Sequence, residues 1–254
     1  MIVYRKKFLG IVEYWNNEKP DAPAVDLIRC FQQPHPIEGM ICREFFTILL
    51  DINRDDEEIF GGIKRDTRYE IRRATSKDGL SCDYFDGMDS EAFQRFCDYY
   101  DEFANQKAQP KLNRAWLSLL AESGALTLSR VNDASEERET LVWHAYHRSN
   151  VRATLLYSAS LFREHDDSAR RNMIGRANRF LHWQDILRFK AAGVSVYDFG
   201  GWYEGTTNRE RLSINHFKEE FGGEIVKNYI CERAITIKAK LFLRLRRLLL
   251  GNAI

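Results

Sequence analysis

Residues 194–225 constrain the fold of this chain more than any other stretch, because they combine a strand, a glycine turn, a polar loop and a helix. The run Val194-Ser195-Val196-Tyr197 is typical of a buried strand. Gly200-Gly201 then predicts a turn. Apolar residues follow at helical spacing, namely Ile214, Phe217 and Phe221. Polar residues should therefore gather at one sheet edge: Asp198, Glu204, Arg209, Arg211 and Lys218.

This stretch also resembles a known family. YDFGGW at residues 197–202 and INHFKEEFGGE at residues 214–224 resemble the closing motif of the Fem family. Fem proteins are aminoacyl-tRNA-dependent transferases that build peptidoglycan cross-bridges, and they belong to the GNAT superfamily of acyltransferases. The segments Phe217-Lys218-Glu219 and Phe221-Gly222-Gly223-Glu224 match that motif, whereas Glu220 replaces its usual glycine.

Two further segments carry the resemblance, in the family's order. Residues 68–74, with Gly79 after them, resemble the helix motif R-x-x-I-R-K/R-A…G, and residues 178–183 resemble the L-x-W helix that precedes the strand. The resemblance implies a mixed α/β, GNAT-like fold with a mostly antiparallel sheet flanked by helices. It also implies that the strand at residues 151–162 splays away from the strand at residues 194–197.

Periodicity and turn residues predict the same order of elements independently. We expect strands at residues 8–15, 25–31, 45–52, 80–85, 126–131, 140–147, 151–162, 194–197 and 225–231. We expect helices from Asn53 or Asp55 to about residue 77, after Asp89 or Ser90, at 112–120, at 172–191 and around Phe217. Residues 163–171, which include His165, should form a charged loop.

Composition predicts a soluble chain with one domain at residues 1–235 and an appended helix at 236–254. Of the 254 residues, 44% are apolar and 30% charged, and the net charge of +1 gives no global attraction to nucleic acid or lipid. The N-terminus does not resemble a signal peptide, and no 18-residue apolar run occurs. Five scattered cysteines predict free thiols in a reducing cytoplasm.

Direct acyl transfer needs a site that aligns an amine with an activated carbonyl, stabilises the oxyanion and moves one proton. The resemblance implies that Lys218 holds substrate phosphate and supports the transition state. Asp198 follows a buried strand and could act as the base, or it could simply form the turn. Candidate substrate-binding residues are Arg68, Arg72, Tyr197, Trp202, Tyr203, Arg209 and Phe217. No metal cluster is predicted, and we expect structural or surface roles for His144 and His147.

The sequence leaves the acyl donor open between acyl-coenzyme A and aminoacyl-tRNA. Coenzyme-A enzymes of this superfamily cradle pyrophosphate with backbone amides, through a loop of the form Q/R-x-x-G-x-G/A. Residues 172–177 fit that pattern except at the first position, which makes Ile174, Gly175, Arg176 and Ala177 the candidate cradle. Nearby arginines would suit a coenzyme A phosphate or the acceptor end of a tRNA: Arg170, Arg171, Arg176 and Arg179. The three Fem-like motifs favour a donor handled as in that family.

The predicted function is transfer of an acyl or aminoacyl group onto an amine, without a covalent enzyme intermediate. The acceptor would be a polar compound that is linked to a sugar or a peptide, or phosphorylated. It would belong to bacterial cell-envelope or small-peptide biosynthesis. Cross-bridge enzymes usually carry two such domains, and this chain has length for one. The alternatives are an acetyl-coenzyme-A-dependent N-acetyltransferase and a non-catalytic scaffold that kept the fold.

The C-terminal segment, residues 236–250, carries five basic residues, no acidic residue and recurring leucines. Such a basic amphipathic helix can dock on the protein's own body or on a partner, or lie on the inner face of an anionic membrane. We expect docking on protein, and we expect deletion of the segment to affect solubility or association more than chemistry.

Overall fold

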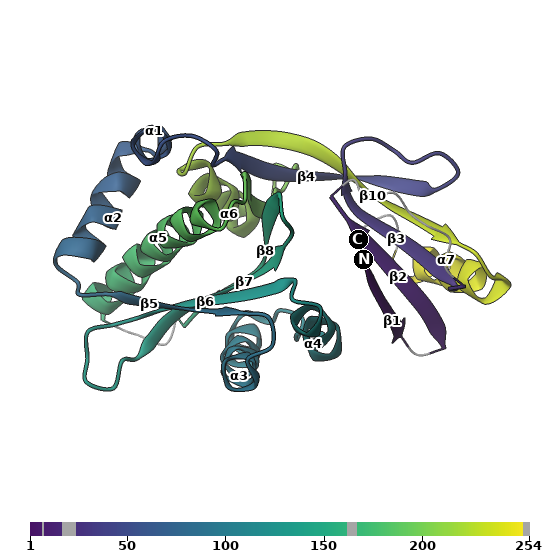
Figure 1. Ribbon diagram of the computed structural model, residues 1–254, viewed down its shortest axis with the longest axis horizontal. Helices are drawn as coiled ribbons and strands as arrows, with labels where there is room; N and C mark the ends of the chain where they lie inside the picture. Colours follow the sequence, from purple (N-terminus) through teal and green to yellow (C-terminus); the bar gives the residue numbers. More distant parts are fainter. Residues whose placement is uncertain (7, 17–23, 162–166, 251–254) are drawn as a thin grey trace. The chain divides into compact units, whose positions relative to one another are not determined.

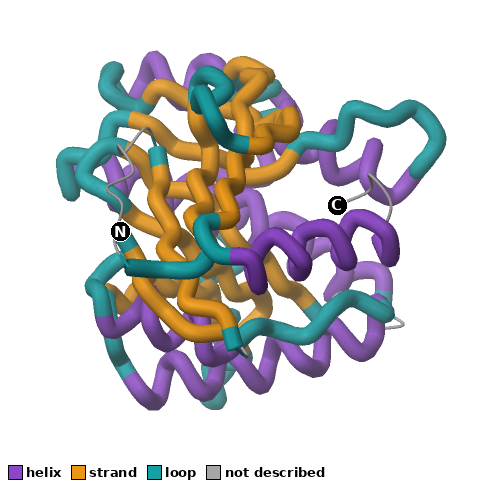
Figure 2. The backbone as a smooth tube through the Cα atoms, turned by 90° about the vertical axis from the view of Figure 1, so that its right-hand side faces the viewer, coloured by secondary structure: helices purple, strands orange, loops and turns teal. Residues whose placement is uncertain are grey.

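The computed structural model describes residues 1–6, 8–16, 24–161 and 167–250, which are drawn in colour in Figures 1 and 2. The chain divides into two compact units. One contains Met1–Thr47 and Val226–Ile254, and the other contains Ile48–Ile225. This division differs from the predicted single domain with an appended helix, because both chain ends contribute to one small unit with apolar clusters of its own.

The larger unit is built on a sheet in the order β4-β9-β8-β7-β6-β5. Its strands are β4 (Ile41–Asp51, which begins in the smaller unit), β5 (Ser81–Asp86), β6 (Leu126–Asn132), β7 (Thr140–Arg148), β8 (Arg152–Ser160) and β9 (Val196–Gly201). Neighbours from β5 to β8 pair antiparallel, whereas β8 and β9 pair parallel. The mixed, mostly antiparallel sheet predicted from the sequence is confirmed.

Helices cover both faces of this sheet (Figure 1). The helices are α1 (Asp56–Gly62), α2 (Arg65–Ser76), α3 (Ser90–Lys107), α4 (Arg114–Glu122), α5 (Ser168–Ala191) and α6 (Arg209–Glu219). Helices α2 and α5 lie together on one side of β5 to β7, and α3 and α4 lie on the other (Figure 1). The side of α5 that faces the sheet carries Phe180, Leu181 and Phe189, which pack with Tyr146 and Tyr197 in the main core.

The structure corrects three element boundaries. The single helix predicted up to residue 77 is two helices, since the chain is extended at Ile63 and Lys64 after Gly61-Gly62. Strand β9 continues through Asp198 to Gly201 rather than ending at residue 197. Helix α5 begins at Ser168, inside the segment predicted as a loop. His165 and the rest of residues 162–166 lie outside the described residues.

In its described residues, the smaller unit contains strands in the order β1-β2-β3-β10 and a helix. The elements are β1 (Ile2–Lys6), β2 (Leu9–Trp15), β3 (Leu27–Gln33), β10 (Glu224–Ala234, which begins in the larger unit) and α7 (Ile237–Leu250). Strand β1 was not predicted. Apolar side chains of α7 pack against the strands: Ala239 and Leu243 meet Leu9, Ile11 and Leu27. The C-terminal helix therefore docks on this unit's own sheet, as expected.

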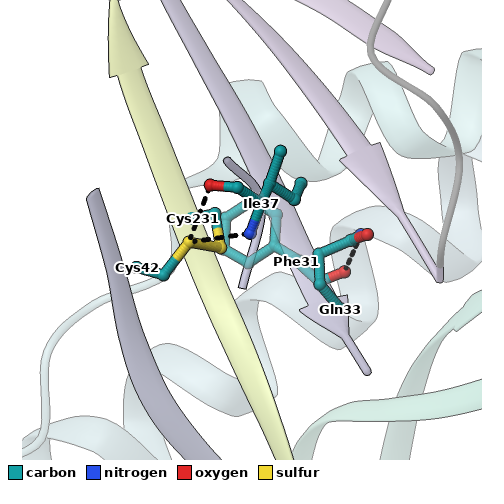
Figure 3. Close-up of a disulfide and its surroundings, with 5 residues drawn as sticks. All are labelled: Phe31, Gln33, Ile37, Cys42 and Cys231. Carbon is teal, nitrogen blue, oxygen red and sulfur yellow. Dashed lines mark hydrogen bonds between the residues drawn. A yellow bond between two sulfur atoms is a disulfide. The ribbon is translucent and has the colours of Figure 1, made fainter. Parts of the chain in front are cut away.

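A disulfide joins Cys42 in β4 to Cys231 in β10 (Figure 3). Their Cα atoms lie 4.0 Å apart although 189 residues separate them in the sequence. The backbone N–H of Ile37 donates to the Cys42 sulfur at 3.3 Å. The prediction that all cysteines are free thiols is wrong for this pair and holds for Cys30, Cys82 and Cys97. Because disulfides persist in oxidising compartments, the cysteines no longer favour a reducing one.

Candidate active site

Strands β8 and β9 separate partway along their length. They pair only at Arg152↔Val196, Ala153↔Tyr197 and Thr154↔Asp198, although β8 runs on to Ser160 and β9 to Gly201. Beyond these pairs a gap opens between β8 and β9, and no further pairing of the two strands occurs among the described residues. The predicted splay is confirmed.

Two glycines, one in β9 and one after α6, permit close approaches between backbone segments. Gly200 has φ +72°, and a Cβ there would lie 2.6 Å from the carbonyl oxygen of Leu155 in β8. Gly223 has φ +90°, and a Cβ there would lie 2.7 Å from the carbonyl oxygen of Leu49 in β4. Only glycine fits either position, because any side chain would be strained and would collide with backbone.

A cavity of about 600 Å³ occupies the gap where the strands part. Its walls come from the end of α3, from β8 and β9 beyond their last pair, and from α5 and α6. The lining residues are Phe103, Lys107, Leu155, Leu156, Ser158, Ser160, Asn178, His182, Phe199, Gly200, Gly201, Glu210, Ser213, Ile214, Phe217 and Lys218. The size suits a small ligand or the end of a larger one, and the mixture of apolar walls with a few polar groups is typical of a ligand site.

Lys218 is the predicted catalytic residue that lines this cavity. Its Nζ donates to the carbonyl oxygen of Gly201 at 2.6 Å, which leaves two further N–H donors. Burial lowers the pKa of Lys218 from 10.5 to about 8, and the negative charge of Asp198 offsets only part of this effect. Near neutral pH the Lys218 amine beside the cavity is therefore mostly a cation. Its pKa lies only slightly above neutral pH, so a small rise in pH would remove its proton.

A buried hydrogen-bonded network lies behind the cavity wall. The Nδ1 atom of His182 lies 2.7 Å from the hydroxyl of Tyr197, which lies 2.7 Å from the hydroxyl of Tyr146. Tyr146 donates to Asp185 Oδ2 at 2.6 Å, and the same oxygen lies 2.8 Å from His144 Nδ1. The two ends of the network reach the cavity. One end is His182, and the other is Asn178, whose Oδ1 lies 2.9 Å from His144 Nε2.

Three groups of this network have shifted pKa values. Burial and the nearby Asp185 carboxylate raise the pKa values of Tyr146 and Tyr197 well above 10. Burial also lowers the pKa of His182 well below 6.5, so that its imidazole is neutral. Groups that stay neutral over the working range of pH do not store a proton. The hydrogen bonds of the network hold His182 and Asn178 in the cavity wall.

Asp198 has the contacts of a structural carboxylate rather than of a base. It is fully buried, and its Oδ2 accepts from Arg152 Nε at 3.0 Å and Nη2 at 2.7 Å. Its Oδ1 accepts from the backbone N–H of Gly200 at 2.9 Å. Both oxygens are thus engaged, and Asp198 does not line the cavity. The role of base predicted for Asp198 does not fit this arrangement, whereas the alternative role in the turn does.

Of the other predicted substrate-binding residues, only Phe217 lines the cavity directly. Tyr197 is buried behind it, as described above. Trp202 donates from Nε1 to Glu219 at 2.9 Å, and the backbone of Tyr203 is bonded to Asn215. The remaining three are arginines outside the lining: Arg68, Arg72 and Arg209. Arg68 donates to the Gly61 carbonyl at 2.6 Å, the Arg72 guanidinium lies 5.1 Å from the centre of the Phe60 ring, and Arg209 is exposed at the start of α6.

The segment predicted to cradle pyrophosphate lies inside α5. Ile174, Gly175, Arg176 and Ala177 come after the first turn of a helix that begins at Ser168, so their amides are used within the helix. Ile174 and Ala177 are also buried. The neighbouring arginines form ion pairs: Arg176 with Asp78, Arg170 with Asp133 and Glu139, and Arg179 with Glu70 and Glu220. The helical placement of these four residues does not fit the backbone cradle that the sequence predicts for them.

Gly175→Ala is expected to stabilise the protein by about 0.5–1 kcal/mol, because glycine inside a helix loses more conformational entropy on folding than alanine does. The nearest atom to a Cβ at this position would be Arg179 Nη1 at 3.9 Å, an ordinary contact. Chemical denaturation would measure the change. The matched control is Gly200→Ala, which should destabilise because of the contact with Leu155. A loss of stability in Gly175→Ala would contradict the helical placement.

Three solved structures are among those whose architecture is similar to that of this chain. FemX matches with a TM-score of 0.59 and 14% identity over 78% of this chain and 63% of that chain. The C-terminal domain of a putative lysylphosphatidylglycerol synthetase from Agrobacterium fabrum matches with a TM-score of 0.54 and 10% identity, over 87% of this chain and 72% of that one. L-PGS from Bacillus licheniformis matches with a TM-score of 0.50 and 13% identity, also over 87% and 72%.

The chain has the GNAT-like fold of FemX. The fold predicted from the three motifs is confirmed. Because the sequence identities are low, the similarity shows the fold alone. No protein-family model matches the chain, and no curated protein matches it in sequence. The chain spans less than two thirds of FemX, 63% of its length.

Within this Fem-like fold, the residue that departs from the family motif has a clear structural role. Glu220 Oε2 accepts from Thr67 Oγ1 at 2.9 Å and from Arg179 Nη2 at 2.9 Å. The Glu220 carbonyl accepts from the backbone N–H of Lys64 at 2.8 Å. Glu220 therefore ties the end of α6 to the start of α2 and to the middle of α5, and of these contacts a glycine could make only the backbone one.

The patterns in the sequence do not predict the buried network. His144 was predicted to be structural or exposed, and it is structural; His182, Asp185 and Tyr146 were not singled out. The one available signal was His182 within the segment resembling the L-x-W helix. Their polar atoms meet because β7, α5 and β9 pack together. The periodicity of one sequence does not show which elements pack against each other.

Proposed function

We propose that this protein transfers an acyl or aminoacyl group to an amine in the cavity where β8 and β9 separate. The observation that carries the proposal is the Lys218 amine beside this cavity, with a pKa lowered to about 8 and two N–H donors left after its bond to Gly201. The FemX-like fold supports the same class of reaction by analogy.

The proposed reaction is direct attack. The neutral acceptor amine attacks the carbonyl carbon of the donor ester or thioester, so that a C–N bond forms and an oxyanion develops. The oxyanion then collapses, the bond to the leaving oxygen or sulfur breaks, and the proton lost by the amine ends on that leaving group. The Lys218 ammonium would donate to the oxyanion. No group of the protein becomes acylated.

An aminoacyl ester donor fits the residues better than coenzyme A does. At the start of α5, where a pyrophosphate would meet free amides, Asp167 already caps Ala169 N at 2.8 Å. The first turn also holds Arg170 in its pairs with Asp133 and Glu139. An added phosphate there would face three carboxylates. We therefore infer that the ester end of an aminoacyl-tRNA enters the cavity.

The acceptor would be a polar amine compound, as on a sugar- or peptide-linked precursor of cell-envelope or small-peptide biosynthesis. The lining offers hydroxyl, amide and ammonium groups, namely Ser158, Ser160, Asn178, Ser213 and Lys107. The positive charge of Lys107 is partly balanced by Glu210, 3.7 Å away. Such groups suit an acceptor that carries many hydrogen-bonding atoms, including a phosphorylated one.

The test is turnover with radiolabelled aminoacyl-tRNA, and separately with acetyl-coenzyme A, on a panel of sugar- and peptide-linked amines. Ser213→Trp should lower turnover about 100-fold or more, because an exposed residue of α6 would then fill the cavity and displace the substrate. The matched control, Ser76→Trp at an exposed position in α2, should leave turnover unchanged.

Two outcomes would overturn the proposal. Turnover that Ser213→Trp leaves intact would place the chemistry elsewhere. Absence of turnover with either donor across the acceptor panel would favour a binding protein that kept the fold. Transfer from acetyl-coenzyme A alone, blocked by Ser213→Trp, would keep the site and replace the donor.

A further inference from the structure

Helix α7 presents an apolar stripe on the side that does not pack against the sheet. Ile237, Leu241, Leu245 and Leu248 each expose between 53% and 81% of their surface. At about 100° of rotation per residue, these four side chains fall within an arc of roughly 80°. Exposed leucines scattered singly are ordinary, but an aligned row along a helix marks an interaction surface.

The core does not account for this stripe, because the opposite side of α7 already makes the contacts with the sheet. Ala239 and Leu243 are buried there. Arg246 on the same side pairs with Glu232 of β10. The start of the helix is also fixed, since Thr236 Oγ1 donates to Asp26 Oδ1 at 2.8 Å. The helix is therefore docked in one rotation, and that rotation turns the leucine row outward.

Basic residues border the stripe on both sides. Lys240 and Arg244 are exposed along one border, and no ion pair of either is found among the described residues. Lys238 borders the other side, where it pairs with Asp26 at 2.8 Å and donates to the carbonyl of Phe8 at 3.0 Å. That contact brings Phe8, itself 59% exposed, beside the first turn of α7. The helix has no acidic residue.

We propose that the outer side of α7, with Phe8 beside its first turn, binds the surface of an anionic lipid bilayer. A row of leucines between basic borders matches the boundary between acyl chains and anionic headgroups. A second copy of the chain is a poorer occupant, because a symmetric contact would bring Lys240 and Arg244 of both copies together without any acidic residue.

The proposed binding is to the membrane surface, not across it. Among the described residues, no helix is long and apolar enough to cross a bilayer. Helix α7 is a surface element held by the sheet, so that its leucines would reach only the headgroup boundary. The proposal concerns the smaller unit and stands whether or not the proposed acyl transfer is correct.

Co-sedimentation of the full chain with vesicles tests the proposal. Vesicles of phosphatidylcholine alone are compared with an equal mixture of phosphatidylcholine and phosphatidylglycerol. The wild type should bind the anionic vesicles, and added salt should weaken that binding because the Debye length shortens. Changing Leu241, Leu245 and Leu248 together to Gln should lower the affinity at least about 100-fold, since the apolar contact is lost. Lys240→Gln with Arg244→Gln should lower it about 30-fold, at about fivefold for each charge.

Matched controls alter equally exposed residues outside α7. The apolar control changes Ile41, Val151 and Ile225 to Gln, and the charge control changes Lys64 and Lys77 to Gln. Both controls should bind as the wild type does, and circular dichroism should show that every variant is folded. Equal binding to neutral and anionic vesicles, no binding to either, or equal losses in the controls would overturn the proposal. A dimer in sedimentation velocity that the three leucine changes dissociate, without vesicle binding, would assign the stripe to self-association instead.

Discussion

Lys218→Met should lower turnover about 100- to 1,000-fold while the protein stays folded, which is the usual cost of removing one donor to a developing oxyanion. Methionine keeps most of the apolar volume of the lysine stem but removes its charge and its donors. The hydrogen bond to the Gly201 carbonyl disappears as well. The measurements are steady-state turnover on the best acceptor and thermal melting of both proteins.

The pH dependence separates the role of an ammonium donor from that of a base. Because burial lowers the pKa of Lys218 to about 8, a required ammonium predicts activity that falls as the pH rises through about 8. Lys218→Arg keeps a cation at every working pH, so that it should retain activity and lose this alkaline fall. The ratio of the two pH profiles cancels the titration of the acceptor amine. A ratio that rises in favour of the wild type above pH 8 would contradict the ammonium role and indicate a base.

The same pKa shift makes a prediction about stability. Between about pH 8 and 10.5 the unfolded state binds more protons at Lys218 than the folded state does. The free energy of unfolding of the wild type, relative to Lys218→Met, should therefore increase as the pH rises through that window. Denaturation of both proteins at pH 7.5 and pH 10 would measure the difference. If the relative stability did not change, the Lys218 amine would be hydrated in the folded protein and its pKa would not be lowered.

Much of the fold was predictable because its signals are local. Asp89, one of the two predicted cap positions, accepts from Ala92 N, and the predicted helix that follows buries Phe96 and Tyr100. Lys218 and Phe217, both singled out in the motif at residues 197–224, line the cavity. Local patterns of this kind depend on neighbours within a few residues, and one sequence displays them fully.

The failures arose where distant segments determine the outcome. Cys42 and Cys231 are joined although they lie at opposite ends of the chain. The predicted phosphate arginine Arg176 meets Asp78, which precedes it by 98 residues. The predicted base Asp198 meets Arg152, 46 residues away. In each instance the sequence shows a reactive or charged residue. It does not show the partner, because tertiary packing brings that partner from a distant segment.

Arg152→Met should be among the most destabilising single changes in this protein, at about 3–5 kcal/mol, because it leaves the Asp198 carboxylate buried without its cation. The side chains of this pair are 9% and 0% exposed. Their bond joins the first residue of β8 to Asp198, which is in the last paired position of β9, so that the loss should also loosen the cavity. Chemical denaturation measures the effect. The matched control is Arg95→Met, whose pair with Glu91 is exposed and should contribute no more than about 1 kcal/mol.

Asp198→Asn in the Arg152→Met background tests the cause of that loss. The amide keeps an oxygen that can accept from the Gly200 N–H and removes the charge that Arg152 balances. The double variant should therefore be more stable than Arg152→Met alone, because the cost lies in a buried unpaired charge rather than in lost packing. Additive losses would contradict this account. If Asp198→Asn alone abolished turnover without lowering stability, Asp198 would be the base after all, and its pairing with Arg152 would have to open during the reaction.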